Sequence, residues 1–476
     1  MVLIISSRVA QFILLFLTIK ISTSLLLPSE MAKVYIINSL FSFFALIFIN
    51  PVGMYINRRL HSWNSSGKIS IYFNYFWCYL VIICLFGYLL LELLFRLKLF
   101  QLNTELKYIS MLVFSTLFFV TINQTVIPSL NLLGFRKCFV VLALATTASS
   151  LAFATLLVYF LKPIAEYWLS GILIGYILLT FMGWRFFYCR INSGVISNNV
   201  GIPKLVSIVK FSIPISISVG LGWFQSQSYR FMMESSLGMH ELGLFAAGYG
   251  ISLGIISAFE SIFTTYLQPK FYKNISTGGL VEQANAWRDY AGSIFPSMIL
   301  VGFVIIATAS DVTRVILGRE YWSASQFVIW GVVAELARVA SGVYGMVAHA
   351  RMKTKLLIVP SLVGALTSVG LIWWLIPIYK SNGVGIALMS SSLIILILTY
   401  YFTRKEYVLF LPYGILLRSI FMGISIIILA ELLRLIFGHN ITYINSAVNL
   451  YIVGCIFIFF QYLLLRPLFL SKSIYA

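Results

Sequence analysis

The sequence has little charge and few long polar stretches. Only 10% of its 476 residues are Asp, Glu, Lys or Arg, whereas 60% are hydrophobic and the mean hydropathy is +0.96. The longest polar connections lie near 57–73, 188–204 and 269–289. None of them is long enough to house a soluble catalytic domain, so any activity has to take place within a bilayer.

Cysteine and histidine are also scarce, with five and four residues. The cysteines form no CxxC pair and no histidine stands at ligand spacing, which excludes a disulfide framework and predicts no metal site. A GxxxxGK[ST] nucleotide-binding loop is missing, and we expect no cofactor. The first apolar stretch runs into Leu27-Pro28 without a small-residue cleavage site, so we interpret it as a retained helix.

Apolar stretches are what the chain has in abundance. A helix needs about 20 mostly apolar residues to cross a bilayer, and hydropathy and breaker residues predict about fourteen such spans. We therefore predict an all-α polytopic membrane protein with spans near 9–27, 34–56, 74–95, 108–133, 138–160, 164–187, 205–229, 241–268, 290–310, 323–350, 356–377, 384–403, 411–437 and 446–466.

The charge that is present is mostly positive, with 33 Lys and Arg against 14 Asp and Glu, a net charge of +19. With both termini in the cytoplasm, about 20 of these cations fall in cytoplasmic loops and about nine in the opposite loops, the bias expected of membrane topology. Because the cations are scattered and form no single basic face, we expect no nucleic-acid partner.

A weak internal repeat divides the chain. The stretch Leu27–Tyr35, between the first two spans, resembles Leu237–Phe245, between the seventh and eighth. Parallel repeats are typical of transporters, with the substrate path at the repeat interface. The predicted organisation is an N-terminal lobe of six helices, a cytoplasmic connector, a C-terminal lobe of six helices and two additional helices, at 1–190, 191–204, 205–403 and 404–476.

Two stretches carry a family resemblance. The run Phe211–Pro214, followed by Trp223, Tyr229–Met232, Gly238 and Gly243–Tyr249, is similar to the seventh-helix region of polysaccharide exporters in the multidrug/oligosaccharidyl-lipid/polysaccharide (MOP) superfamily. Lys353–Pro360, Gly364, Leu375–Tyr379 and Gly383–Ala387 resemble the eleventh-to-twelfth-helix region of the same exporters.

Within this superfamily the chain most resembles the Wzx-type flippases of O-antigen and capsule synthesis. The resemblance implies a MATE-like V of two six-helix lobes in the bacterial inner membrane. It also implies alternating access and an undecaprenyl-pyrophosphate-linked oligosaccharide as cargo, moved from the cytoplasmic to the periplasmic leaflet. A glycan polymerase and a chain-length regulator are the protein partners it suggests, besides membrane lipids.

Charged residues within the spans are rare and expensive, so each is a functional candidate. Lys20 and Arg230 each lie eight residues before the paired Pro28 and Gly238 of the two halves. Two cations facing one cavity suit a pyrophosphate; the alternative is that both extend to the outer interface along their apolar stems.

Span 10 carries Glu335 and Arg338 at i,i+3 spacing, which is typical of a structural pair. A functional alternative is that an anionic substrate competes for Arg338 and thereby releases Glu335. Glu260 in span 8 lacks a local partner in the sequence, and it is either a coupling site for protons or a protonated group bonded to a neighbouring helix. Sodium is the other coupling ion we consider.

Uncharged polar residues complete the candidates. Asn123 and Gln124 in span 4 and Gln225 and Gln227 in span 7 are able to bond sugar hydroxyls or, equally, neighbouring helices. Glu431 and Arg434 repeat the i,i+3 pattern outside the predicted lobes, which favours a structural role.

The sequence therefore predicts a non-enzymatic transporter, a flippase for a lipid-linked oligosaccharide. A multidrug or toxin extruder of the same superfamily is one rival, although such proteins favour acidic groups in the cavity. A membrane polymerase or ligase for the glycan is the other rival. The short outer loops disfavour it, since catalysis there requires a sizeable periplasmic loop.

Overall fold

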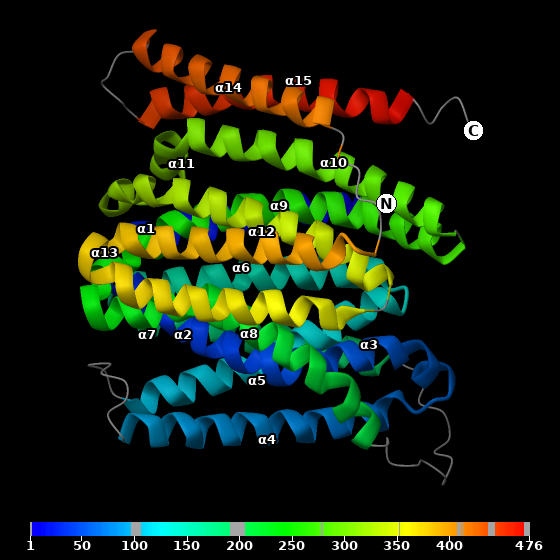
Figure 1. The fold of residues 1–476 in the computed structure, drawn as a ribbon. Helices are drawn as coiled ribbons and strands as arrows, with labels where there is room; N and C mark the ends of the chain where they lie inside the picture. Colours follow the sequence, from blue (N-terminus) through cyan, green and yellow to red (C-terminus); the bar gives the residue numbers. More distant parts are fainter. Residues whose placement is uncertain are drawn as a thin grey trace. The chain divides into compact units, whose positions relative to one another are not determined.

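A computed structural model describes residues 2–96, 106–190, 205–277, 279–351, 353–406, 411, 413–436 and 443–470. The predicted connector 191–204 lies outside these residues. Within them the chain folds into helices joined by short turns (Figure 1). The predicted all-helical membrane fold is confirmed.

Two compact units make up the chain, Met1–Trp223 and Phe224–Ala476. The division falls inside one long helix, so the predicted lobes 1–190 and 205–403 stay predictions. The first unit contains α1 (Val2–Leu25), α2 (Pro28–Phe44), the π-helix η1 (Ala45–Ile49), α3 (Asn50–Ser65), α4 (Ile69–Arg96), α5 (Leu106–Leu132), α6 (Arg136–Phe160), α7 (Ala165–Tyr188) and the start of α8 (Leu205–Leu237).

The second unit contains the rest of α8 and seven further α-helices with two short 3₁₀ segments in its described residues. These are α9 (Met239–Thr277), α10 (Leu280–Ala307), α11 (Ala309–Ile316), η2 (Arg319–Ala324), α12 (Ser325–Ala350), η3 (Thr354–Leu357), α13 (Ile358–Thr403), α14 (Tyr413–Ile436) and α15 (Tyr443–Leu470).

Twelve helices in the described part of the chain are long and apolar enough to cross a membrane. Two features explain why this number is two lower than the fourteen predicted spans. The first predicted span corresponds to α1, whose described apolar part, Ala10–Leu25, is shorter. The eleventh and twelfth lie on either side of a break in α13 at Lys380, where φ is 48° and ψ is −132°.

Helix ends follow local chemistry. Pro28 stands at the first position of α2, where its missing N–H costs no hydrogen bond. Gly134 ends α5 with a φ of 94°, a conformation open to glycine. By contrast, Pro128, Pro214 and Pro296 lie inside α5, α8 and α10, which continue past them. These helices therefore tolerate the loss of one backbone hydrogen bond each without ending.

Close packing inside the first unit depends on small residues. A Cβ at Gly171 or Gly175 of α7 would lie 2.4 Å from a Cα atom of α6, at Ala154 and Ser150 respectively. Small residues four apart let two helices approach closely in a lipid environment, where apolar burial gives little driving force. The close fit of the two helix surfaces therefore stabilises the packing of α6 against α7.

The additional helices α14 and α15 form a hairpin in the second unit (Figure 1). Buried apolar residues of α10, α14 and α15 make one cluster, Leu300, Ala307, Ile426, Ala430, Val453 and Leu464. At its edge Arg434 donates to the carbonyl oxygen of Ala307 at 2.6 Å and to Asp311 Oδ2 at 3.1 Å. Polar bonds thus fix α14 to the α10–α11 junction.

Candidate functional site

A cluster of charged side chains joins α9 and α12 in the second unit. Arg338 Nη2 is 2.7 Å from Oε2 of Glu260, and Arg338 Nε is 2.6 Å from Oε2 of Glu335. Glu335 and Arg338 come from α12, whereas Glu260 comes from α9. The guanidinium group is therefore shared between two carboxylates on two helices.

Small residues along α9 bring these two helices together. A Cβ at Gly248 would lie 2.2 Å from the carbonyl oxygen of Ala324, and one at Gly331 would lie 2.9 Å from the Ser252 side chain. The Ser252 hydroxyl donates to the carbonyl oxygen of Val328 at 2.7 Å. This contact is close enough for Glu260, two turns further along α9, to reach α12.

Exposure differs sharply across the three charged groups. The Glu335 side chain is 6% exposed, that of Glu260 26%, and that of Arg338 43%. Glu335 is therefore the buried anchor, and Arg338 offers part of its guanidinium to an outside group. Removing one partner of such an ion pair leaves a charge in a low dielectric, which is costly.

Aromatic side chains extend the cluster. Tyr249 of α9 is buried and hydrogen-bonds with Glu335. Its ring packs near Tyr229, at 6.2 Å between centroids, and Arg230 Nε donates to the Tyr229 hydroxyl at 3.2 Å. A series of contacts thus runs from Glu260 to Arg230, in which the step from Tyr249 to Tyr229 is a ring contact. Its two carboxylates and two guanidinium groups balance in formal charge.

The predicted residues meet different surroundings. Glu335 and Arg338 pair as their spacing predicts. Glu260, which has no local partner in the sequence, finds one in Arg338, 78 positions away. The roles assigned to these three residues in cargo release and coupling stay predictions.

Lys20 and Arg230 belong to different units. Lys20 is half-buried on α1, and the hydroxyl of Ser24 donates to its backbone carbonyl at 2.7 Å. Arg230 is half-buried on α8, with its guanidinium carbon 5.6 Å from the Tyr229 ring centroid. That both cations face one substrate cavity stays a prediction.

The uncharged candidates take part mainly in contacts between helices. The buried Asn123 amide donates to Thr146 of α6 at 3.4 Å, whereas Gln124 is exposed on α5. Gln225 donates to Ser391 and Ser392 of α13 at 3.2 and 3.1 Å. Gln227 is half-buried on α8. Their predicted role in sugar binding stays a prediction, and Gln124 is the most accessible of the four.

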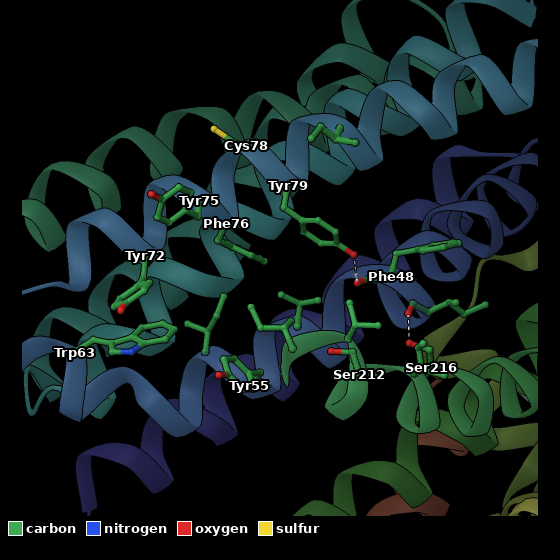
Figure 2. Close-up of a pocket in the computed structure, with 17 residues that line it drawn as sticks. Phe48, Tyr55, Trp63, Tyr72, Tyr75, Phe76, Cys78, Tyr79, Ser212 and Ser216 are labelled. Carbon is green, nitrogen blue, oxygen red and sulfur yellow. Dashed lines mark hydrogen bonds between the residues drawn. The ribbon is translucent and has the colours of Figure 1, made fainter. Parts of the chain in front are cut away.

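Sequence reasoning missed the partner of Arg434 and an apolar cavity. Asp311 of α11 is 2% exposed and accepts from both Arg434 and Asn449. The cavity, about 560 Å³, lies in the first unit between η1–α3, α4 and the start of α8 (Figure 2). Its aromatic lining looks like ordinary helix core in the sequence, which gives no signal of a hollow.

Metal-binding side chains do not gather in the described part of the chain, where no three His, Cys, Asp or Glu residues come together. The cysteines there are free thiols.

Comparison with known proteins connects this geometry to a fold. Neither a protein-family model nor a curated protein matches the sequence. Among solved structures, the lipid II flippase MurJ in an inward closed conformation matches with a TM-score of 0.67 and 15% identity, covering 98% of this chain and 99% of that one. An inward-facing multidrug resistance MATE transporter of the MOP superfamily matches with a TM-score of 0.65 and 12% identity, covering 83% and 94%.

A third match is a MOP superfamily transporter from Pyrococcus furiosus, with a TM-score of 0.53, 12% identity, and coverage of 84% of this chain and 94% of that one. That transporter is described as having a binding pocket of reverse polarity, which suggests a different function for it. At these identities the likeness concerns the fold. The chain has the helical fold that MurJ and the MATE transporters share.

Proposed function

We propose that this protein is a membrane transporter that flips a lipid-linked oligosaccharide between bilayer leaflets by alternating access. The observation that carries the proposal is the extent of the fold match with the lipid II flippase. It leaves out only 2% of this chain, about ten residues, so it must include most of 404–476. The two additional helices are thus part of the likeness to a flippase.

In the proposed mechanism Arg338 is the group that recognises the anionic head of the cargo. Its half-exposed guanidinium already holds two carboxylates, and a pyrophosphate offers the same geometry of paired oxygens. When the cargo binds Arg338, Glu260 loses its partner and gains affinity for a proton or a sodium ion. Exchange of the carboxylate for the phosphate couples cargo binding to ion binding.

The finer assignments follow the sequence. We propose undecaprenyl pyrophosphate as the lipid carrier and an O-antigen or capsule repeat unit as the sugar. Transport runs from the cytoplasmic to the periplasmic leaflet of the inner membrane, with both termini in the cytoplasm as the distribution of Lys and Arg favours. A polymerase and a chain-length regulator would act on the delivered product.

One observation favours a second candidate, a multidrug extrusion antiporter. Arg338 is directly paired with two carboxylates, so the trio alone carries a net negative charge when both are ionised. Acidic groups attract cationic drugs. The fold matches with MATE transporters agree with this candidate, although they cover 83–85% of this chain where the flippase covers 98%.

Deleting the gene in its own host tests these candidates together. A flippase predicts that lipid-linked oligosaccharide accumulates on the cytoplasmic leaflet, measured by its protection from an impermeant oxidant in intact spheroplasts. Unchanged glycan with increased drug sensitivity would instead identify the extruder. Normal flipping with unpolymerised repeats would identify a polymerase. Restoring the wild-type gene on a plasmid is the control.

A further inference from the structure

The cavity in the first unit is lined by aromatic and aliphatic side chains. Trp63 and Tyr72 stack at one side, with ring centroids 4.3 Å apart, and Phe76 and Tyr79 of α4 form another part of the wall (Figure 2). The described lining contains no Asp, Glu, Lys, Arg or His. The interior therefore suits an uncharged, apolar guest.

Two carbonyl groups beside the cavity have hydrogen-bond partners, whereas the buried hydroxyl of one described lining residue has none. Residues in the π-helix η1 direct two carbonyl groups outward, and Tyr79 donates to Phe48 O at 2.8 Å while Ser216 donates to Ile47 O at 2.7 Å. Ser212 is 8% exposed, and its buried hydroxyl has no hydrogen-bond partner. It points into the cavity (Figure 2). An unpaired hydroxyl in this position is costly unless a guest bonds to it.

Positive charge stands at the rim. The Arg59 guanidinium lies 5.8 Å from the ring centroid of Tyr55, a lining residue. An apolar chamber with a cation at its edge is complementary to an amphiphile whose apolar chain ends in an anionic group.

The cavity also opens towards lipid. Tyr75 and Ile82 of α4 and Val209 and Ile213 of α8 line it and are themselves exposed. Exposed apolar side chains on membrane-spanning helices face hydrocarbon, so a lipid chain is able to enter sideways without crossing water. A cationic drug is disfavoured, because the lining offers it no carboxylate.

We propose that this cavity binds the carrier chain of the cargo before the head group reaches Arg338, with the first isoprene units against the aromatic wall and the lipid-linked phosphate at Arg59. The Ser212 hydroxyl donates to an oxygen of the phosphate group. This inference rests on the proposed function and adds a carrier-recognition site in the first unit, distinct from the charge cluster of the second. Selection of one lipid among many phospholipids requires such a fitted site.

Photocrosslinking tests the proposal on the full-length protein in phospholipid nanodiscs. The probe is undecaprenyl phosphate with a diazirine in its first isoprene units, and the crosslinked peptides are identified by mass spectrometry. We expect crosslinks in α4 near Cys78 and in the η1–α3 segment. Unlabelled undecaprenyl phosphate should remove them, whereas added phosphatidylglycerol should not.

Two variants that introduce the same side chain provide the comparison. Ser212→Phe fills the cavity and removes the hydroxyl, and we expect at least about a tenfold loss of crosslinking. Val141→Phe adds a ring at an exposed position on α6 of the same unit and should leave crosslinking unchanged. Ser212→Ala removes the hydroxyl alone, keeps the fold and should weaken competition by the unlabelled carrier.

Three results would overturn the inference, and they differ in what they leave standing. Saturable crosslinks confined to other segments would refute this site but keep the proposed function. Competition by phosphatidylglycerol equal to that by the carrier would make the occupant a phospholipid. Saturable crosslinks absent from every segment would contradict both this inference and the proposed function.

Discussion

The two units differ in the polarity of their most distinctive sites. The first contains a cavity whose described lining has no Asp, Glu, Lys, Arg or His and includes one buried hydroxyl without a partner, that of Ser212. The second contains a charge cluster in which each guanidinium or carboxylate named above has a polar partner. In a bilayer an isolated charge is costly, so charge persists only where it is compensated. We infer a division of work, with recognition of the lipid carrier in the first unit and exchange of the charged head group at the ion-pair cluster of the second.

The largest expected effect is that of Arg338→Ala, which removes the shared cation of the second unit. Two carboxylates would then face each other without compensation. We expect a loss of about 3 kcal/mol in unfolding free energy, the low end for a buried pair because Arg338 is partly exposed. Thermal unfolding in nanodiscs measures the loss, and surface glycan should disappear.

Arg338→Lys separates charge from geometry in the same experiment. Lysine keeps the positive charge but cannot form the two-sided contact, so stability should largely return while glycan export stays low. If Arg338→Ala unfolds at the wild-type temperature, the cluster is not a compensated network and the contrast between the units fails.

Lys20→Ala and Arg230→Ala compare the two units directly. Each removes a half-buried cation on a spanning helix, and we expect each to abolish surface glycan while leaving the protein level intact. Immunoblotting of membranes gives the level, and glycan staining gives the export. Normal glycan in both variants would remove the two cations from the mechanism.

Glu260→Gln has a narrower expected effect, on coupling. The amide keeps a hydrogen bond to Arg338 but cannot bind or release a proton. Transport by the variant should therefore lose its response to an imposed pH gradient across vesicles, while stability changes little. Glu431→Gln is the matched control, because it removes a carboxylate beside Arg434 outside the cluster. An unchanged pH response in Glu260→Gln would exclude Glu260 as the coupling residue.

Glu406→Gln should have the smallest effect. Hydrogen bonds from Lys353, at 2.8 and 2.9 Å, lower the pKa of the Glu406 carboxyl below its ordinary value of 4.5, with a further contribution from Arg351. A lowered pKa means that the ion pair stabilises the fold above pH 4.5 and is lost as pH falls. The variant should lose at most about 1 kcal/mol at neutral pH and nothing in acid. A larger loss than that of Arg338→Ala would reverse the expected order.

Local patterns predict some parts of this molecule well. Hydropathy identifies the spans because the bilayer dictates helix length, and the i,i+3 spacing of Glu335 and Arg338 predicts their pairing. Pro377 and Gly383 bracket the break at Lys380 within α13, so the division of this helix is also readable from the sequence.

Contacts between segments that are distant in the sequence could not be predicted from the sequence alone. Glu260 meets Arg338 only because glycines on α9 and α12 bring the helices together, and Asp311 meets Arg434 across 123 positions. The π-helix η1 has no distinctive sequence, yet its two outward carbonyl groups shape the cavity. Such features depend on packing, which one sequence without relatives does not reveal.

Flipping by the purified protein is the most direct measurement of the central claim. The full-length chain is reconstituted in liposomes with the lipid-linked oligosaccharide of its host, and the sugar is oxidised by impermeant periodate added outside. We predict that inner-leaflet oligosaccharide becomes accessible in vesicles with the wild-type protein and stays protected in vesicles with Arg338→Ala. If the oligosaccharide in wild-type vesicles were protected as fully as in protein-free liposomes, the account would be contradicted.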